Sequence, residues 1–157
     1  GASTGGFTDC MLQNGASKVY SVDVGSSQLD GSIRANSKVV VMENTDIRNL
    51  QKKQVPDINF VVCDVSFISL TLISHKISEL LNSGDYGVVL IKPQFECGKV
   101  LAKKYKGVIK DEKIHKMVIN TVTENFVQNG IDIINVKESQ IKGGDGNTEF
   151  VALIKKA

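Results

Sequence analysis

Short apolar segments alternate with longer amphipathic ones along the chain. The first four apolar segments are rich in Val and Ile and do not alternate cleanly with polar residues, which is typical of parallel strands covered on both faces. The last two are separated only by a loop, so we expect them to pair as an antiparallel hairpin. The predicted strands are residues 18–23, 39–42, 58–63, 86–91, 131–137 and 149–154.

Helical patterns fill the gaps between the predicted strands. Segment 7–13 ends close to Gly15, a natural residue after a helix. Segment 28–35 is short, and segment 70–81 collects its apolar residues on one face. The longest segment, 111–128, aligns four apolar side chains in one stripe, Ile114, Val118, Val122 and Phe126.

This order predicts an α/β fold with a Rossmann-like doubly wound sheet, mostly parallel and ending in a C-terminal antiparallel hairpin. Residues 1–157 are expected to form one domain. The glycine-rich residues at the start are of the kind that follow a first strand, so a further strand is expected before Gly1. Without that central strand, two facing strand edges would lack partners.

The amino-acid composition is that of a soluble globular domain. The 157 residues are 41% hydrophobic and 23% charged, with a formal net charge of +2, which is ordinary for a soluble globular domain. No apolar run approaches the roughly 20 residues that span a bilayer, so we expect a cytoplasmic protein without a membrane partner. Segment 97–110 holds five lysines and no acid; it is either a solvated loop or a mobile arm that meets phosphates next to an active site.

The cysteines and histidines offer no metal site by their spacing. Three cysteines without a CxxC pattern argue against a disulfide framework or a zinc site. Cys10 and Cys63 are predicted to be packing residues. His75 and His115 have no partner at metal-ligand spacing and are predicted to lie at the surface.

Residues 1–9 carry the strongest chemical signal. Three glycines and two hydroxyl residues stand directly before the first predicted helix, and Asp23 ends the next strand. A glycine-rich turn lets the backbone approach a ligand, and an acid at the end of the following strand can hold both hydroxyls of a ribose. The pattern indicates a nucleoside-containing cofactor.

Charged residues stand at the ends of three other predicted strands. Asp64 and Lys92 follow their strands, and Glu149 begins the last strand, which runs in the opposite direction. Ligands of open α/β sheets bind at the carboxyl ends of the strands, so these three side chains are expected to meet at one rim beside the glycine-rich turn. Charged residues also end strands simply because strands end at the surface, but three together favour a site.

Four sequence blocks resemble the haemolysin A (TlyA) family, which is similar to the FtsJ-type ribosomal RNA 2′-O-methyltransferases. The blocks cover the chain in order and lie at residues 1–9, 64–70, 92–96 and 146–150. The resemblance implies S-adenosylmethionine as cofactor and ribosomal RNA or a ribosomal subunit as partner. It also implies an S4-type RNA-binding domain upstream of the methyltransferase domain.

The resemblance further implies roles for individual residues. The cofactor would lie against Gly1, Ala2, Ser3, Gly5 and Gly6 with Phe7 behind it, and would contact Asp23, Asp46 and Asp64. The family uses a Lys-Asp-Lys-Glu tetrad, and Asp64, Lys92 and Glu149 match its last three members. The first lysine would precede Gly1.

The chemistry of methyl transfer suits these residue types. A sulfonium is already a good leaving group, so the protein must mainly align a ribose 2′-oxygen and help to remove its proton. Lys92 is the candidate base or hydroxyl-orienting group, held by Asp64 and Glu149. Two carboxylates favour the charged ammonium, which is a poor base, and a second lysine would counter this effect.

Three other interpretations remain open. A dinucleotide oxidoreductase would also use a glycine-rich turn and an acid, but the GxGxxG spacing is missing. A pore-forming haemolysin would need membrane-spanning or amphipathic segments. A non-catalytic RNA-binding domain would keep the same fold. Phe67 and Phe95 follow Asp64 and Lys92 at similar distances along the chain, and each is either a residue that stacks on a splayed base or a core residue.

Overall fold

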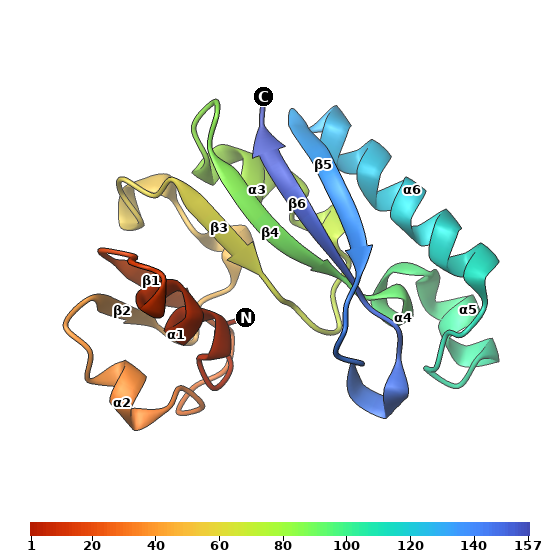
Figure 1. Cartoon of the computed structure of the whole chain (residues 1–157), viewed down its shortest axis with the longest axis horizontal. Helices are drawn as coiled ribbons and strands as arrows, with labels where there is room; N and C mark the ends of the chain where they lie inside the picture. Colours follow the sequence, from red (N-terminus) through yellow and green to blue (C-terminus); the bar gives the residue numbers. More distant parts are fainter. The chain divides into compact units, whose positions relative to one another are not determined.

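The computed structural model describes all 157 residues. They form two compact units, Gly1–Asp57 and Ile58–Ala157, here called unit 1 and unit 2 (Figure 1). Each unit has a β-sheet of its own. The expectation of one domain over the whole chain stays a prediction.

Unit 1 is built on a two-stranded parallel sheet, in which Val19 pairs with Val39 and Val22 with Met42. The first helix packs on this sheet through its buried Thr8, whose hydroxyl lies 2.9 Å from the Ser21 hydroxyl. The elements are α1 (Gly6–Gln13), β1 (Val19–Val22), α2 (Gly31–Arg34), β2 (Val39–Met42), η1 (Ile47–Asn49) and η2 (Lys52–Gln54).

Unit 2 is built on a four-stranded sheet with the order β3-β4-β6-β5. The pair β3–β4 is parallel, whereas β6 runs antiparallel to both of its neighbours. The elements are β3 (Phe60–Cys63), η3 (Leu70–Leu72), α3 (Ser74–Leu80), β4 (Tyr86–Ile91), α4 (Pro93–Glu96), α5 (Gly98–Lys104), α6 (Glu112–Gln128), β5 (Ile131–Glu138), η4 (Gly144–Gly146) and β6 (Phe150–Lys156).

The core of unit 2 lies between the sheet and the helices α3 and α6. The long helix α6 runs alongside β5 (Figure 1), and its apolar stripe is buried from Ile114 to Phe126 as predicted. The two helices are joined by hydrogen bonds, such as that between the Ser74 hydroxyl and Asn125 Oδ1 at 2.6 Å. The sheet contributes alternate side chains, including the fully buried Val89 and Ile154.

All six predicted strands are present, and the C-terminal hairpin is antiparallel as expected. The strands form two sheets, because β1 pairs only with β2 and β3 only with β4. The α/β fold class is confirmed by these elements and by solved methyltransferases described below.

The predicted helices differ from the observed ones in length. Helix α2 is shorter than 28–35, because the Asp30 carboxylate accepts a hydrogen bond from the Ser32 N–H and so caps the helix at that point. Segment 70–81 is divided at Ile73, whose φ of −124° is not helical. The short helices α4 and α5 were not predicted, since neither is long enough to show a clear apolar period.

Two predictions about single residues were wrong. Cys10 is exposed rather than packed, because it lies on the outer side of α1. His115 is buried rather than at the surface, since its ring packs edge-on against Phe150 with the centroids 5.3 Å apart. Cys63 is buried as predicted, and burial raises the pKa of its thiol to about 11.

Candidate active site

The glycine-rich turn of unit 1 joins the beginning of the chain to β1 and α1. The Ala2 N–H donates to the Val22 carbonyl at 3.0 Å, and the Gly5 N–H donates to the Ala2 carbonyl at 2.9 Å. Gly5 has a φ of 105°, and a Cβ there would lie 2.5 Å from Ile33 Cδ1. Both the backbone angle and the close packing therefore require glycine at this position.

Asp23 lies directly after β1 and faces this turn. Its Oδ2 accepts the Ser3 N–H and its Oδ1 accepts the Gly25 N–H, each at 2.8 Å. Burial alone would raise the pKa of the Asp23 carboxyl, but these backbone hydrogen bonds outweigh burial and hold the pKa below its usual value. An ionised carboxylate offers about four acceptor positions, so Asp23 can still accept hydrogen bonds from further hydroxyl groups.

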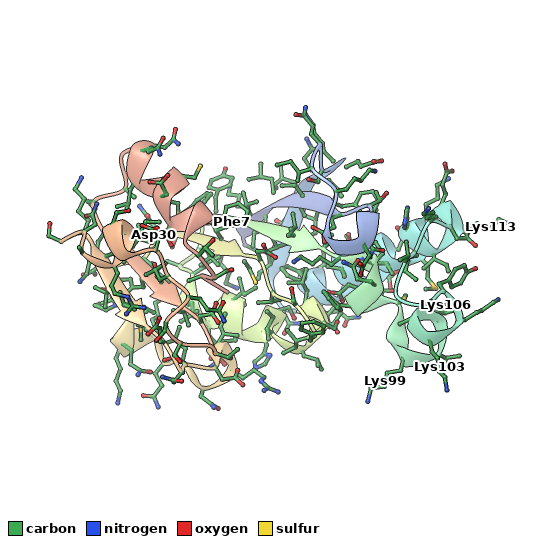
Figure 2. All side chains as sticks on the ribbon, turned by 90° about the horizontal axis from the view of Figure 1, so that it is seen from below. Phe7, Asp30, Lys99, Lys103, Lys106 and Lys113 are labelled. Carbon is green, nitrogen blue, oxygen red and sulfur yellow. The ribbon has the colours of Figure 1, made fainter.

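Two other predicted cofactor residues of unit 1, Asp46 and Phe7, form no hydrogen bond with the glycine-rich turn. The Asp46 carboxylate caps η1 and is bound by the Arg48 guanidinium, whose Nε lies 3.0 Å from both carboxylate oxygens. Phe7 lies on the first turn of α1 and is 40% exposed, so its ring is available at the surface of unit 1 (Figure 2).

In unit 2 the predicted pair Asp64 and Lys92 is in contact. Lys92 Nζ lies 2.6 Å from Asp64 Oδ1 and also donates to the Ser66 hydroxyl at 3.3 Å. Asp64 Oδ1 is buried and has no well-aligned hydrogen bond, so the ammonium is its electrostatic partner. Lys92 follows β4 directly and Asp64 follows the neighbouring parallel strand β3, which is why both side chains reach the same end of the sheet.

Glu149 lies at the same end of the sheet, one position before β6. The register pairs Ile91 with Phe150, so Glu149 stands opposite Lys92 on the adjacent strand. Only 6% of Glu149 is exposed, and its Oε1 accepts a hydrogen bond from Gln94 Nε2 at 3.1 Å. A Cβ at Gly143 would lie 2.0 Å from this Oε1, so glycine at position 143 leaves the room that the carboxylate occupies.

The geometry differs from the expected triad in one respect. Lys92 forms an ion pair with Asp64, but no ion pair joins Lys92 to Glu149. The Gln94 amide is the group that binds Glu149 instead, and the Oε1 atom of Gln94 is buried without a hydrogen-bond partner. The sheet therefore brings all three predicted residues to one end, and Gln94 is an additional polar group among them.

Glu96 fixes the segment that connects β3 to η3. Its Oε1 accepts the Leu70 N–H at 2.8 Å and its Oε2 accepts the Ser69 hydroxyl at 2.5 Å. Burial raises the pKa of the Glu96 carboxyl although these hydrogen bonds act in the opposite direction. The segment that carries Asp64 is therefore fastened at both ends, to Lys92 and to Glu96.

Replacing Glu96 should change both the stability of unit 2 and its pH dependence. Because the folded-state pKa is raised, the contribution of Glu96 to stability is fully present below the unfolded pKa of about 4.3 and is lost as pH rises through the folded pKa. Glu96→Gln should remove this pH dependence, whereas Glu96→Ala should cost about 1–3 kcal/mol because the buried Leu70 N–H loses its acceptor.

Urea unfolding measured at several pH values checks this prediction. Glu112→Gln is the matched control, since Glu112 is an exposed acid in the first turn of α6. An unfolding free energy that keeps the same pH dependence in Glu96→Gln would contradict the assignment.

Phe67 is exposed beside the Asp64–Lys92 pair. It has a φ of 64°, a backbone conformation that bulky residues rarely adopt, and 91% of it is exposed. Its ring lies 5.0 Å from the Phe95 ring at an interplanar angle of 52°. Of the two roles considered from the sequence, core packing is therefore excluded for Phe67.

Gln94, Glu96 and Gly143 were not singled out from the sequence. Gln94 and Glu96 lie within the block 92–96, and their place in that block was the one available signal. Gly143 gave no signal, because its importance follows from the side chain that lies against it.

One hollow on the surface of unit 2 lies apart from this site. It has a volume of about 460 Å³ and is lined by residues of the sheet such as Val88, Asn135, Lys137, Val151 and Leu153. None of the predicted site residues borders it. No helix of the chain has both the length and the apolar character needed to cross a membrane.

Comparisons with known proteins identify the family. The family model described as FtsJ-like methyltransferase matches residues 1–156. The chain is 38% identical over 150 residues to the 23S rRNA (cytidine-2′-O)-methyltransferase TlyA of Campylobacter jejuni, covering 96% of this chain and 58% of that protein. The chain spans between 54% and 64% of the length of the curated relatives that it matches.

Solved structures agree with this result. A structure described as a hemolysin candidate from Lactococcus lactis is 43% identical, with a TM-score of 0.93 over 100% of this chain and 76% of that one. A candidate S-adenosylmethionine-dependent methyltransferase from Listeria monocytogenes shares the fold at 17% identity, with a TM-score of 0.72 over 100% of this chain and 88% of that one. The chain therefore belongs to the FtsJ-like methyltransferase family.

Proposed function

We propose that the protein transfers a methyl group from S-adenosylmethionine to a ribose 2′-hydroxyl of ribosomal RNA. The observation that carries the proposal is the Asp64–Lys92 pair with the buried Glu149 at one end of the sheet, in a chain of the FtsJ-like methyltransferase family. Its relative TlyA of Campylobacter jejuni is a 23S rRNA (cytidine-2′-O)-methyltransferase. An RNA substrate of this kind would place the protein in the cytoplasm.

The residues of unit 1 fit a nucleoside cofactor. The ionised Asp23 has acceptor positions left for the two ribose hydroxyls. Of residues 1–6, only Gly5 is buried. A Cβ at Gly6 would meet nothing within 4 Å, so the backbone is open at this position. In this proposal Asp46 and Phe7 flank the cofactor, and bound S-adenosylmethionine supplies an activated methyl group on a sulfonium.

The residues of unit 2 act on the hydroxyl group in this proposal. Lys92 binds the ribose 2′-oxygen and holds it in line for the transfer, which can contribute several kcal/mol through orientation. Asp64 keeps the Lys92 side chain in place through the ion pair of 2.6 Å. Glu149 holds the Gln94 amide at 3.1 Å, and both line the position of the incoming ribose.

The strained loop presents Phe67 to a nucleobase in this proposal. Its ring is 91% exposed and is supported from one side by Phe95. Stacking on an aromatic ring suits a splayed base of single-stranded RNA and is worth about 1–3 kcal/mol per base.

Phe67→Ala is expected to weaken the binding of RNA about tenfold through the loss of stacking. The affinity of the protein for S-adenosylmethionine should not change. Phe60→Ala is the matched control, because Phe60 is 43% exposed at the opposite end of β3. Titration of both variants with ribosomal RNA measures the effect, and equal affinities would rule out stacking by Phe67.

Methyl transfer to total bacterial ribosomal RNA tests the proposed function directly. S-adenosylmethionine with a labelled methyl group should label the RNA at a ribose, which makes one phosphodiester bond resistant to alkaline cleavage. Label on a base would contradict the site of transfer. RNA binding without label would favour the non-catalytic RNA-binding domain, and NAD binding would favour the oxidoreductase.

A further inference from the structure

The lysine-rich segment after α4 forms a compact surface rather than an extended arm. Helix α5 takes up residues 98–104, and the chain then turns through Lys106 and Gly107, which both have positive φ. We call the exposed lysines of this region the lysine surface: Lys99, Lys103, Lys104, Lys106, Lys110 and Lys113.

The lysine surface is strongly basic for its size. Residues 98–113 hold six lysines and two acids, whereas the whole chain has a net charge of only +2. None of the six lysines forms an ion pair. Of the acids, Asp111 is used within the fold, because its carboxylate caps α6 and accepts the Tyr105 hydroxyl at 3.2 Å. Figure 2 shows Lys99, Lys103, Lys106 and Lys113 gathered at one end of unit 2.

Asn147 fastens this basic segment to the fold. Its Oδ1 accepts the Ile109 N–H at 2.9 Å, and its Nδ2 donates to the Gly107 carbonyl at 2.9 Å. On the other side, His115 Nε2 lies 2.9 Å from the Ile109 carbonyl. Ile109 itself is fully buried, so the end of the segment cannot move independently of its neighbours.

The same asparagine belongs to the loop that carries Glu149. Asn147 lies two residues before Glu149, and its carbonyl accepts the Gly143 N–H at 2.9 Å. Gly143 in turn lies against the Glu149 carboxylate. The lysine surface and the carboxylate are therefore parts of one hydrogen-bonded assembly that has Asn147 at its centre.

We propose that the lysine surface binds the phosphate backbone of the RNA substrate, and that Asn147 is a positioning residue that holds this surface in register with Glu149. The inference rests on the proposed RNA substrate. Lysine–phosphate contacts do not read sequence, but they fix the register of the nucleic acid on the protein. By holding the lysine surface in place, Asn147 determines where a bound RNA strand lies relative to Glu149 and the other site residues at the end of the β-sheet.

The first test removes charge from the lysine surface. The triple variant Lys99→Gln, Lys103→Gln, Lys106→Gln should bind total ribosomal RNA at least about tenfold more weakly at low salt. The slope of log affinity against log salt should become shallower by about 2, because each neutralised phosphate of a single strand contributes about 0.7 to that slope. The matched control removes the same charge from exposed lysines of unit 1, Lys18→Gln, Lys38→Gln, Lys53→Gln.

Binding is measured without S-adenosylmethionine, so that this result is independent of methyl transfer. Loss of affinity in the triple variant but not in the control supports the lysine surface even if no methyl group is transferred. Efficient methylation together with unchanged affinity of the triple variant would overturn the lysine surface and leave the proposed function in place.

The second test separates positioning by Asn147 from a merely structural role. Asn147→Ala should lower kcat for methylation about tenfold, while the affinities for RNA and for S-adenosylmethionine stay close to those of the unchanged protein. Hydrogen exchange should show faster exchange of the Ile109 N–H with the rest of unit 2 still protected.

A second variant keeps the test informative if Asn147→Ala unfolds. His115→Gln retains a donor that can reach the Ile109 carbonyl and should keep kcat, whereas His115→Ala should lower kcat as Asn147→Ala does. An unchanged kcat in folded Asn147→Ala, or equal losses in kcat and in both affinities, would overturn the assignment.

Discussion

Lys92→Met is expected to lower the rate of methyl transfer about 1,000-fold, within the range that a positioned acid–base group contributes. Methionine matches the length of lysine but can neither orient a 2′-hydroxyl nor accept its proton. The affinity for S-adenosylmethionine should fall far less than the rate, because all proposed cofactor residues except Asp64 belong to unit 1. Single-turnover transfer to ribosomal RNA measures the rate, and cofactor titration measures the affinity.

The loss of the ammonium also leaves Asp64 Oδ1 buried without a partner, so the variant needs a control for folding. The double variant Asp64→Asn, Lys92→Met removes the unpaired charge and should be equally inactive while unfolding at a higher temperature than the single variant. Lys76→Met is the matched control, since Lys76 pairs with Glu79 on α3 and is equally enclosed. A rate close to that of the unchanged protein in Lys92→Met would exclude the proposed role.

Arginine at position 92 distinguishes the two roles that remain open for this lysine. The guanidinium stays charged at every relevant pH and can orient a hydroxyl, but it cannot take up a proton. Substantial activity in Lys92→Arg would assign orientation to Lys92, and inactivity together with a rate that rises with pH in the unchanged protein would assign deprotonation.

Asp23→Asn is expected to weaken the binding of S-adenosylmethionine about 100-fold, because two hydrogen bonds from hydroxyls to a charged group are each worth about 1.5–3 kcal/mol. The amide would also place an NH2 group against the Ser3 or Gly25 N–H, where a donor faces a donor. Calorimetric titration with S-adenosylmethionine measures the loss. Glu43→Gln is the matched control, since Glu43 is an acid after β2 that pairs with Arg34 instead.

The same carboxylate predicts how unit 1 responds to acid. Backbone hydrogen bonds hold the pKa of Asp23 below its usual value in spite of burial, so its contribution to stability is present above the unfolded pKa of about 3.9. That contribution is lost as pH falls through the lower folded pKa, and Asp23→Asn should lose it at every pH. Equal cofactor affinity in Asp23→Asn and Glu43→Gln would contradict the assignment.

The strands could be predicted because each one is a short continuous run of apolar residues, many of them Val or Ile, and such a run can be recognised without knowing its distant contacts. The runs 39–42 and 86–91 coincide with β2 and β4, and the hairpin followed from the short connection between the last two strands. The break at Ile73 and the helices α4 and α5 could not be predicted in the same way. They depend on contacts with distant residues, such as that of Glu96 with Leu70.

Of the candidate site, only the residues next to the ends of predicted strands could be predicted from the sequence. Asp64 and Lys92 follow adjacent parallel strands, so their contact could be expected from the order of elements alone. The hydrogen bond between Gln94 and Glu149 could not be predicted. Gln94 lies on the four-residue helix α4, which has no sequence signature. The role of Asn147 could not be predicted either, because its hydrogen bonds to Gly107 and Ile109 form only once the lysine-rich segment has folded back against it.

The place of β6 in the sheet has a consequence for the synthesis of the protein. This strand follows β5 in the chain, yet it lies between β4 and β5 and pairs with both. Until residues 150–156 have left the ribosome, β5 has no strand to bind and β4 has a partner on one side only. Glu149 reaches Gln94 only when β6 is in place, so nascent chains that stop before this strand carry a sheet of two strands and an unfinished site.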